Sequence, residues 1–268
     1  KAGRKLLPSI AVGLSLIALV WFTLSYQREI FAIVVAVAVI LGLRELVRAF
    51  AARGIVISFN TLTLAAIGLS YAAWVGGVAG LAIATAIAFP LLLIRALLQG
   101  PDGFVAKATA TTFGLLYLPF LAGFLILLAR PSTGFQRVMT FMVLVGCNDT
   151  FGYIVGVLLG KHPLVPKISP KKTWEGLAGS IIFTVIGGCL AFKYIMDMHW
   201  WIGIIVGLMI VFTATCGDLI ESAMKRDMSL KDMGTLLPGH GGMLDRLDSV
   251  VLSAPALWLA LELVKHFL

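Results

Sequence analysis

Long apolar runs separated by short polar segments make up most of the chain. About 20 apolar residues in a helix span the roughly 30 Å hydrocarbon core of a bilayer, and these runs lack the alternation of barrel strands. We therefore predict an all-α, polytopic integral membrane protein with about nine transmembrane helices. The predicted spans are residues 6–26, 30–50, 61–75, 78–98, 108–129, 135–159, 174–196, 200–221 and 248–267. The third is short and ends at Gly76 and Gly77, so it can also form a hairpin with the fourth that crosses incompletely.

Composition supports a membrane protein. Of the 268 residues, 60% are hydrophobic and 13% are charged, a balance that soluble domains of this size do not reach. The three cysteines, Cys147, Cys189 and Cys216, lie inside apolar runs and match neither a disulfide framework nor a metal motif. The first run is too long for a signal-peptide core, and we expect it to be a retained span.

The net charge of +8 reflects basic residues at the ends of the spans. Such residues set topology and meet anionic lipid head groups, so we expect membrane lipids as partners and no nucleic acid. With the N-terminus in the cytoplasm, most Lys and Arg side chains fall on the cytoplasmic side, as do the polar loops 160–173 and 222–247. Arg44 and Glu45, near the end of the second span, are expected to be interfacial or snorkelling side chains.

The sixth span contains Asn148 and Asp149, about 16 Å along the helix from Gly160 and so well inside the membrane. A carboxylate at this depth needs a wet cavity, a cation or a partner, and we predict a functional cavity rather than a packing contact. Gly152, Gly156 and Gly160 recur every fourth residue, which predicts a close helix–helix contact.

The loop before the seventh span contains Lys171 and Lys172, followed by Thr173. Prolines exclude a helix through this loop, and Thr173 is expected to be an N-cap that bonds to Gly176. Paired lysines beside a helix N-terminus suit an anion, although a topological anchor explains the same composition.

A second polar cluster joins the last two spans. Asp218, Glu221, Ser222 and Lys225 share one helical face, on which an acidic and a basic group can also form a simple ion pair. The cluster continues with Arg226, Lys231, Asp232, His240, Gly241, Gly242, Asp245, Arg246 and Asp248. Carboxylates without cysteine suit a hard cation such as Mg²⁺, and Lys and Arg suit phosphates. Phosphoryl or nucleotidyl transfer uses this combination, with His240 expected to bind phosphate rather than to transfer a proton.

The segment from Ser222 to Asp248 resembles the signature of phosphatidate cytidylyltransferases, also called CDP-diacylglycerol synthases. The matching positions are Ser222, Lys225, Arg226, Lys231, Asp232, Gly234, His240, Gly241, Gly242, Asp245, Arg246 and Asp248. Asn148, Asp149 and the segment 169–176 are similar to the family as well, so the resemblance covers about residues 140–268. We accordingly predict an N-terminal transmembrane region of about five spans over residues 1–135 and a catalytic region over 136–268, with the signature loop at 222–248.

The resemblance implies that phosphatidate attacks the α-phosphorus of CTP to form CDP-diacylglycerol and pyrophosphate in phospholipid biosynthesis. It also implies Mg²⁺ held by Asp218 and Asp245, a monovalent cation such as K⁺ alongside, and a homodimer. We expect a polar intramembrane cavity that opens to the cytoplasm, in the plasma membrane of a prokaryote. The expected catalytic residues are Asp218, Asp245, Lys225, Arg226 and Asp248. The expected substrate-binding residues are Asn148, Asp149, Lys171, Lys172, Ser222, Lys231, Asp232, His240, Gly241, Gly242 and Arg246.

Three alternatives explain fewer of these residues. An ion-coupled transporter accounts for the buried acids but leaves Lys225, Arg226 and Lys231 without a role. A polyprenol kinase or an archaeal-lipid cytidylyltransferase uses CTP on another lipid and shares much of the chemistry. A membrane scaffold does not explain so dense a cluster of charges.

Overall fold

The computed structural model describes residues 6–234 and 241–267, and these form two compact units. Unit 1 comprises residues up to Ser132 together with Met228–Leu247, and unit 2 comprises Thr133–Asp227 together with the chain from Asp248 onward. The segment Met228–Leu247 thus groups with the N-terminal helices, although it lies inside the predicted catalytic region. Seven helices among the described residues are long and apolar enough to cross a membrane, which confirms the predicted fold class, whereas the count of nine spans stays a prediction.

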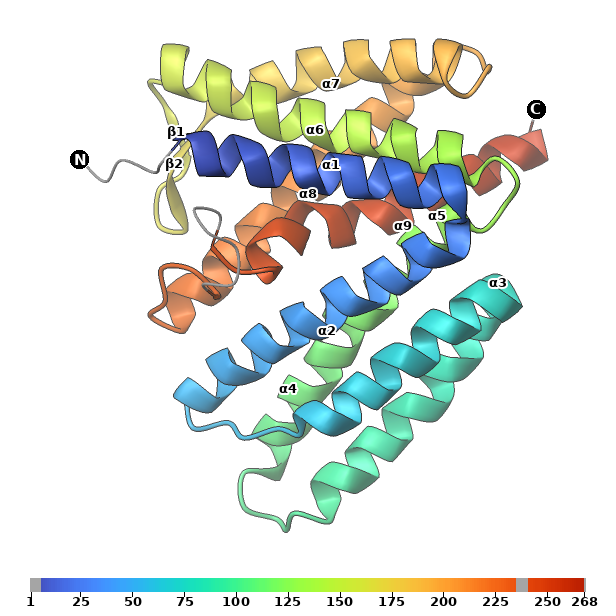
Figure 1. The fold of residues 1–268 in the computed structure, drawn as a ribbon. Helices are drawn as coiled ribbons and strands as arrows, with labels where there is room; N and C mark the ends of the chain where they lie inside the picture. Colours follow the sequence, from blue (N-terminus) through green and yellow to red (C-terminus); the bar gives the residue numbers. More distant parts are fainter. Residues whose placement is uncertain (1–5, 235–240, 268) are drawn as a thin grey trace. The chain divides into compact units, whose positions relative to one another are not determined.

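Unit 1 is built from helices that bury a leucine-rich core. Its elements (Figure 1) are α1 (Leu6–Tyr26), α2 (Arg28–Ala52), α3 (Phe59–Leu97), α4 (Phe104–Leu115), the π-helical turn η1 (Leu116–Phe120) and α5 (Leu121–Ala129). Leu43 and Leu46 of α2, Leu62 of α3 and Leu118 of η1 are fully buried. The π-helical turn contains Pro119, whose missing N–H interrupts regular helical hydrogen bonding.

The predicted third and fourth spans form the single element α3, which is broken at Gly77. Gly77 has φ 62° and ψ −147°, a conformation outside the helical region that glycine adopts readily. The Arg130 side chain donates to the carbonyls of Trp74 (2.7 Å) and Val75 (3.0 Å) just before the break. A Cβ at Gly80 would overlap the Ala72 carbonyl oxygen, so the two halves of α3 fold back on each other as a hairpin (Figure 1).

Unit 2 contains α6 (Gly134–Leu159), strands β1 (Pro163–Val165) and β2 (Ser169–Thr173), α7 (Trp174–Tyr194), α8 (Ile202–Asp227) and most of α9 (Leu244–Phe267). Helices α6 and α7 pack side by side (Figure 1). At their contact a Cβ on Gly156 would meet Gly176 Cα at 3.6 Å, which confirms that the glycine stripe is a packing surface. Thr173 Oγ1 accepts the Gly176 amide at 3.1 Å, which confirms the predicted N-cap.

Strands β1 and β2 form an antiparallel ribbon between α6 and α7. The prolines of this loop exclude a helix, as predicted, but the strand pairing was not predicted. Strand β2 of the ribbon packs against α6, α7 and α8, and this packing fixes the positions of Lys171 and Lys172 within unit 2.

Candidate functional site

Three carboxylates converge in unit 2. Asp218 and Glu221 lie three residues apart on α8, and Asp248 lies on α9; one ligand oxygen from each lies within 4.8 Å of the other two. Gly217 permits this approach, since a Cβ there would overlap the Asp248 carbonyl oxygen. Glu221 is fully buried, whereas Asp218 and Asp248 are half-buried. We call Asp218, Glu221 and Asp248 the acidic cluster.

Two lysines contact the acidic cluster. Lys172 Nζ lies 2.6 Å from Asp218 Oδ2, and Lys225 pairs with Glu221 Oε2 one helical turn away. Lys171 is exposed beside Lys172 on β2, and adjacent strand residues point to opposite faces. The structure therefore brings Lys172 and Lys225 to the acidic cluster but directs Lys171 elsewhere.

Asn148 and Asp149 extend the polar region from α6. Asn148 Nδ2 donates to Asp149 Oδ1 at 2.9 Å. Ser249, the residue after Asp248, donates from its Oγ to Asp149 Oδ2 at 3.2 Å. Asn148 is buried, and its Oδ1 accepts no hydrogen bond from the described residues. An acceptor without a donor at this depth is costly, which marks Asn148 as a candidate binding residue rather than a packing residue.

The remaining predicted residues of unit 2 lie on α8. Ser222 Oγ donates to Asp218 Oδ1 over a long 3.4 Å. Arg226 is exposed, and its Nε donates to the Ile168 carbonyl at 3.3 Å, between the two strands of the ribbon. Arg226 thus ties the ribbon that contains Lys172 to the helix that contains Asp218.

The donor set of the acidic cluster fits a hard divalent cation. All three side chains offer oxygen, whereas the cluster includes neither thiol nor imidazole, and Mg²⁺ prefers oxygen ligands. The ion pairs that Asp218 forms with Lys172 and that Glu221 forms with Lys225 show that these two carboxylates already attract cationic groups. Asp218 was predicted as a metal ligand, and Glu221 and Asp248 are the acids that the structure places beside it.

The predicted residues of unit 1 belong to the signature segment that leads into α9. Asp245 Oδ2 accepts the amides of Met233 (3.0 Å) and Gly242 (2.8 Å), which joins the two described ends of the signature segment. Gly241 has φ 84°, where glycine is favoured. Lys231 and Asp232 are exposed and Arg246 is half-buried, while His240 lies outside the described residues. That all predicted residues meet in one cavity stays a prediction.

Sequence reasoning missed two acidic residues. Glu221 was placed on the same helical face as Asp218 but was not assigned to the site, although its spacing from Asp218 was a signal for the acidic cluster. Glu45 was interpreted as interfacial; instead it is 6% exposed, and its carboxylate accepts the amides of Met243 and Leu244. A contact between residues about 200 positions apart leaves no local sequence signal.

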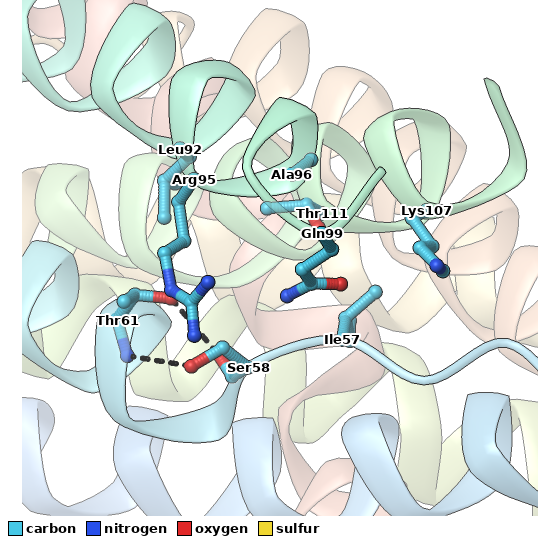
Figure 2. A pocket seen from close by; sticks show the side chains of 9 residues that line it. All are labelled: Ile57, Ser58, Thr61, Leu92, Arg95, Ala96, Gln99, Lys107 and Thr111. Carbon is cyan, nitrogen blue, oxygen red and sulfur yellow. Dashed lines mark hydrogen bonds between the residues drawn. The ribbon is translucent and has the colours of Figure 1, made fainter. Parts of the chain in front are cut away.

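Unit 1 also contains a small pocket, which Figure 2 shows between the two ends of α3 and the start of α4. Arg95 lies over Ser58 and Thr61 at one end of the pocket, and Lys107 lies at the other. Among the described residues that line the pocket there is no carboxylate. None of these lining residues was predicted to belong to the functional site. The pocket therefore lacks the metal-binding side chains that the predicted chemistry needs.

Comparisons with known proteins match almost the whole chain. The profile described as "Cytidylyltransferase family" matches residues 9–264. A phosphatidate cytidylyltransferase of Mycobacterium leprae is 38% identical over 98% of this chain and 90% of its own length. One from Mycobacterium bovis is 35% identical over 98% of this chain and 90% of its own length. One from Staphylococcus haemolyticus is 34% identical over 74% of this chain and 76% of its own length.

Proposed function

Because this chain belongs to the cytidylyltransferase family, we propose that it transfers the cytidylyl group of CTP to phosphatidate and forms CDP-diacylglycerol and pyrophosphate. The observation that carries the proposal is the acidic cluster of Asp218, Glu221 and Asp248, with Lys172 and Lys225 in contact with it. Oxygen ligands beside cationic groups are what a polyphosphate substrate requires.

The reaction needs positioning and charge neutralisation more than proton transfer. A phosphate oxygen of phosphatidate bonds to the α-phosphorus of CTP, while the bond from that phosphorus to the oxygen bridging to the β-phosphorus breaks. The attacking phosphate is already ionised at neutral pH, so no side chain has to remove a proton. Pyrophosphate leaves with the electrons of the broken bond.

The acidic cluster and Asp245 are the proposed metal-holding groups. Bound Mg²⁺ would neutralise charge on the CTP phosphates, and a monovalent cation such as K⁺ is proposed alongside it. Lys172, Lys225 and Arg226 are proposed to bind phosphate oxygens, together with Lys231 and Arg246, whereas Lys171, on the opposite face of its strand, is proposed to act on the substrate only through long-range attraction. Lysine binds phosphate as a point charge on a flexible stem, so Lys172 and Lys225 can turn from a carboxylate to a phosphate without moving the backbone.

Asn148, Asp149, Ser222 and Asp232 are proposed to shape the substrate site, with Gly241, Gly242 and His240 in the loop beside it. Asn148 offers a buried acceptor, Oδ1, to a substrate donor. An amide is suited to recognising a nucleotide through hydrogen bonds, because it presents donor and acceptor atoms together.

We propose that the site opens to the cytoplasmic side of a plasma membrane and that the protein is a homodimer. Its product, CDP-diacylglycerol, would enter phospholipid biosynthesis. CTP is soluble and charged, so a cytoplasmic opening gives it direct access, while phosphatidate would enter from the bilayer. The basic residues at the ends of the apolar spans support this orientation.

The test is a transfer assay with purified protein in detergent. With phosphatidate, Mg²⁺ and CTP labelled at the α-phosphate, we expect label in the lipid extract and an equal amount of released pyrophosphate. Lipid label from the γ-phosphate instead would indicate a kinase. Folded protein without lipid-dependent turnover of CTP would overturn the assignment and favour a transporter.

A further inference from the structure

Glu45 is a buried acid of α2 that the proposed chemistry does not use. Its Oε1 accepts the Met243 amide at 3.0 Å, and its Oε2 accepts the Leu244 amide at 2.8 Å. Leu244 is the first residue of α9, and the first amides of a helix lack intrahelical partners. One carboxylate from a distant helix therefore satisfies two successive amides where α9 begins.

The backbone around Glu45 is shaped to admit this carboxylate. A Cβ at Gly234 would overlap Glu45 Oε1, and a Cβ at Gly242 would overlap Glu45 Oε2. Both glycines belong to the signature segment, and glycine permits this close backbone approach. A side chain at either position would therefore displace the Glu45 carboxylate, and at Gly242 it would also meet the Gly234 amide nitrogen at 2.7 Å.

The same segment is held from inside by Asp245. Its Oδ2 accepts the amides of Met233 and Gly242, which lie next to Gly234 and Met243 respectively. Two carboxylates therefore fix the segment: Asp245 joins its two described ends, and Glu45 fastens the second end, at the start of α9, to α2. A shift of the Glu45 contact would move the first turn of α9, which contains Asp245 and Arg246.

We propose that Glu45 is a positioning residue for cytidylyl transfer: from α2 it fixes the N-terminus of α9, so that Asp245 and Arg246 face CTP and the metal in a defined geometry. This role rests on the proposed function, because Asp245 is a metal ligand only if that function holds. The carboxylate is needed for its two acceptor oxygens and for its charge at a helix N-terminus.

The test compares Glu45→Gln with Glu45→Asp and with Arg44→Gln as the matched control. Glutamine has nearly the same shape but only one acceptor oxygen, whereas aspartate keeps the charge on a shorter stem. Arg44 is exposed on the neighbouring position of α2, and no hydrogen bond or ion pair joins it to the signature segment that the structure describes. We expect kcat for Glu45→Gln to fall roughly 10- to 100-fold, as for other residues that orient ligands.

Three further readouts separate positioning from general stability. For Glu45→Gln, the Mg²⁺ concentration for half-maximal rate should rise about tenfold, and Mn²⁺ binding followed by electron paramagnetic resonance should weaken equally. Amide hydrogen exchange should increase in a peptide containing Met243 and Leu244 but not in peptides from α6 or α7. Glu45→Asp should recover part of kcat, and Arg44→Gln should stay within about twofold of wild type.

Several outcomes would overturn this role. One is folded Glu45→Gln with wild-type kcat and Mg²⁺ dependence. Another is loss of the folded state in both Glu45 variants, which would show that Glu45 supports unit 1 as a whole. If wild-type protein transfers no cytidylyl group, the proposed function fails; the hydrogen-exchange comparison then still decides whether Glu45 anchors this segment.

Discussion

Two carboxylates of unit 2, Asp218 and Glu221, have partners of a different kind from those of Glu45 and Asp245 in unit 1. In unit 2, Asp218 and Glu221 are met by the side-chain ammonium groups of Lys172 and Lys225. In unit 1, Glu45 and Asp245 are met by backbone amides of the signature segment. A lysine head group on a flexible stem can move aside for a metal ion or a phosphate, whereas an amide moves only with its backbone.

We call Asp218 and Glu221 exchanging acids, because their lysine partners can move aside. We call Glu45 and Asp245 frame acids, because they hold backbone amides in place. The acidic cluster offers converging oxygens, and the lysine partners of Asp218 and Glu221 are replaceable, as a metal site requires, whereas Asp248 Oδ1 accepts the Ser249 amide at 2.6 Å. Glu45 has both oxygens committed to the start of α9, which suits a structural support. Asp245 combines a framework contact through Oδ2 with its predicted role as a metal ligand, and that role stays a prediction.

The largest effect is expected for Asp218→Asn, which removes one charge from the acidic cluster while preserving shape. We expect kcat/KM for CTP to fall at least roughly 100-fold. Weaker Mg²⁺ binding would leave the negative charge of the CTP phosphates without its counter-ion. Transfer assays across a Mg²⁺ titration measure this, and Mn²⁺ binding should weaken in parallel.

Asp197→Asn is the matched control for Asp218→Asn. Asp197 is exposed in unit 2 with φ 53°, a conformation that asparagine also adopts, so we expect activity within about twofold of wild type. Near-normal activity of Asp218→Asn together with inactive Asp245→Asn would reverse the comparison and place the metal at the frame acid.

Sequence reasoning found the elements that depend on local pattern. Apolar runs predicted the helices, the spacing of Thr173 and Gly176 predicted an N-cap, and the signature segment predicted the family, which the comparisons confirm. The ribbon of β1 and β2 was missed because excluding a helix does not specify a strand register. Glu45 was misinterpreted because a lone acid near the end of a span has the same local appearance whether it faces lipid or amides.

A second, intermediate effect is expected for Gly242→Ala in the frame of unit 1. The added methyl group would overlap Glu45 Oε2 and lie 2.7 Å from the Gly234 amide nitrogen. Overpacking of this kind costs about 1–3 kcal/mol of unfolding free energy, and we expect kcat to fall roughly 10-fold or more as Asp245 shifts. Thermal unfolding and transfer assays measure the two effects.

Gly68→Ala provides the control for Gly242→Ala. Gly68 lies in α3 with nothing within 4 Å of an added Cβ, so alanine should raise stability by about 0.5–1 kcal/mol through helix propensity. Equal behaviour of the two variants would show that the backbone around Glu45 is loose, and the distinction between frame acids and exchanging acids would then fail.

The smallest effect separates Lys172→Met from Lys171→Met, two neighbours that sequence analysis treated alike. Lys172 contacts Asp218 at 2.6 Å, whereas Lys171 is exposed on the same strand. Methionine keeps most of the apolar stem and removes the charge. We expect Lys172→Met to lower kcat/KM for CTP roughly 10-fold, while Lys171→Met changes it only about threefold. A charge in direct contact with the acidic cluster is screened less than an exposed one.

A salt titration distinguishes two origins of this difference. If both lysines act through long-range attraction, the ratio of the two effects should shrink when KCl is raised to about 0.5 M. If Lys172 touches phosphate, the ratio should persist. Equal losses for both variants at every salt concentration would mean that strand alternation does not decide which lysine serves the site.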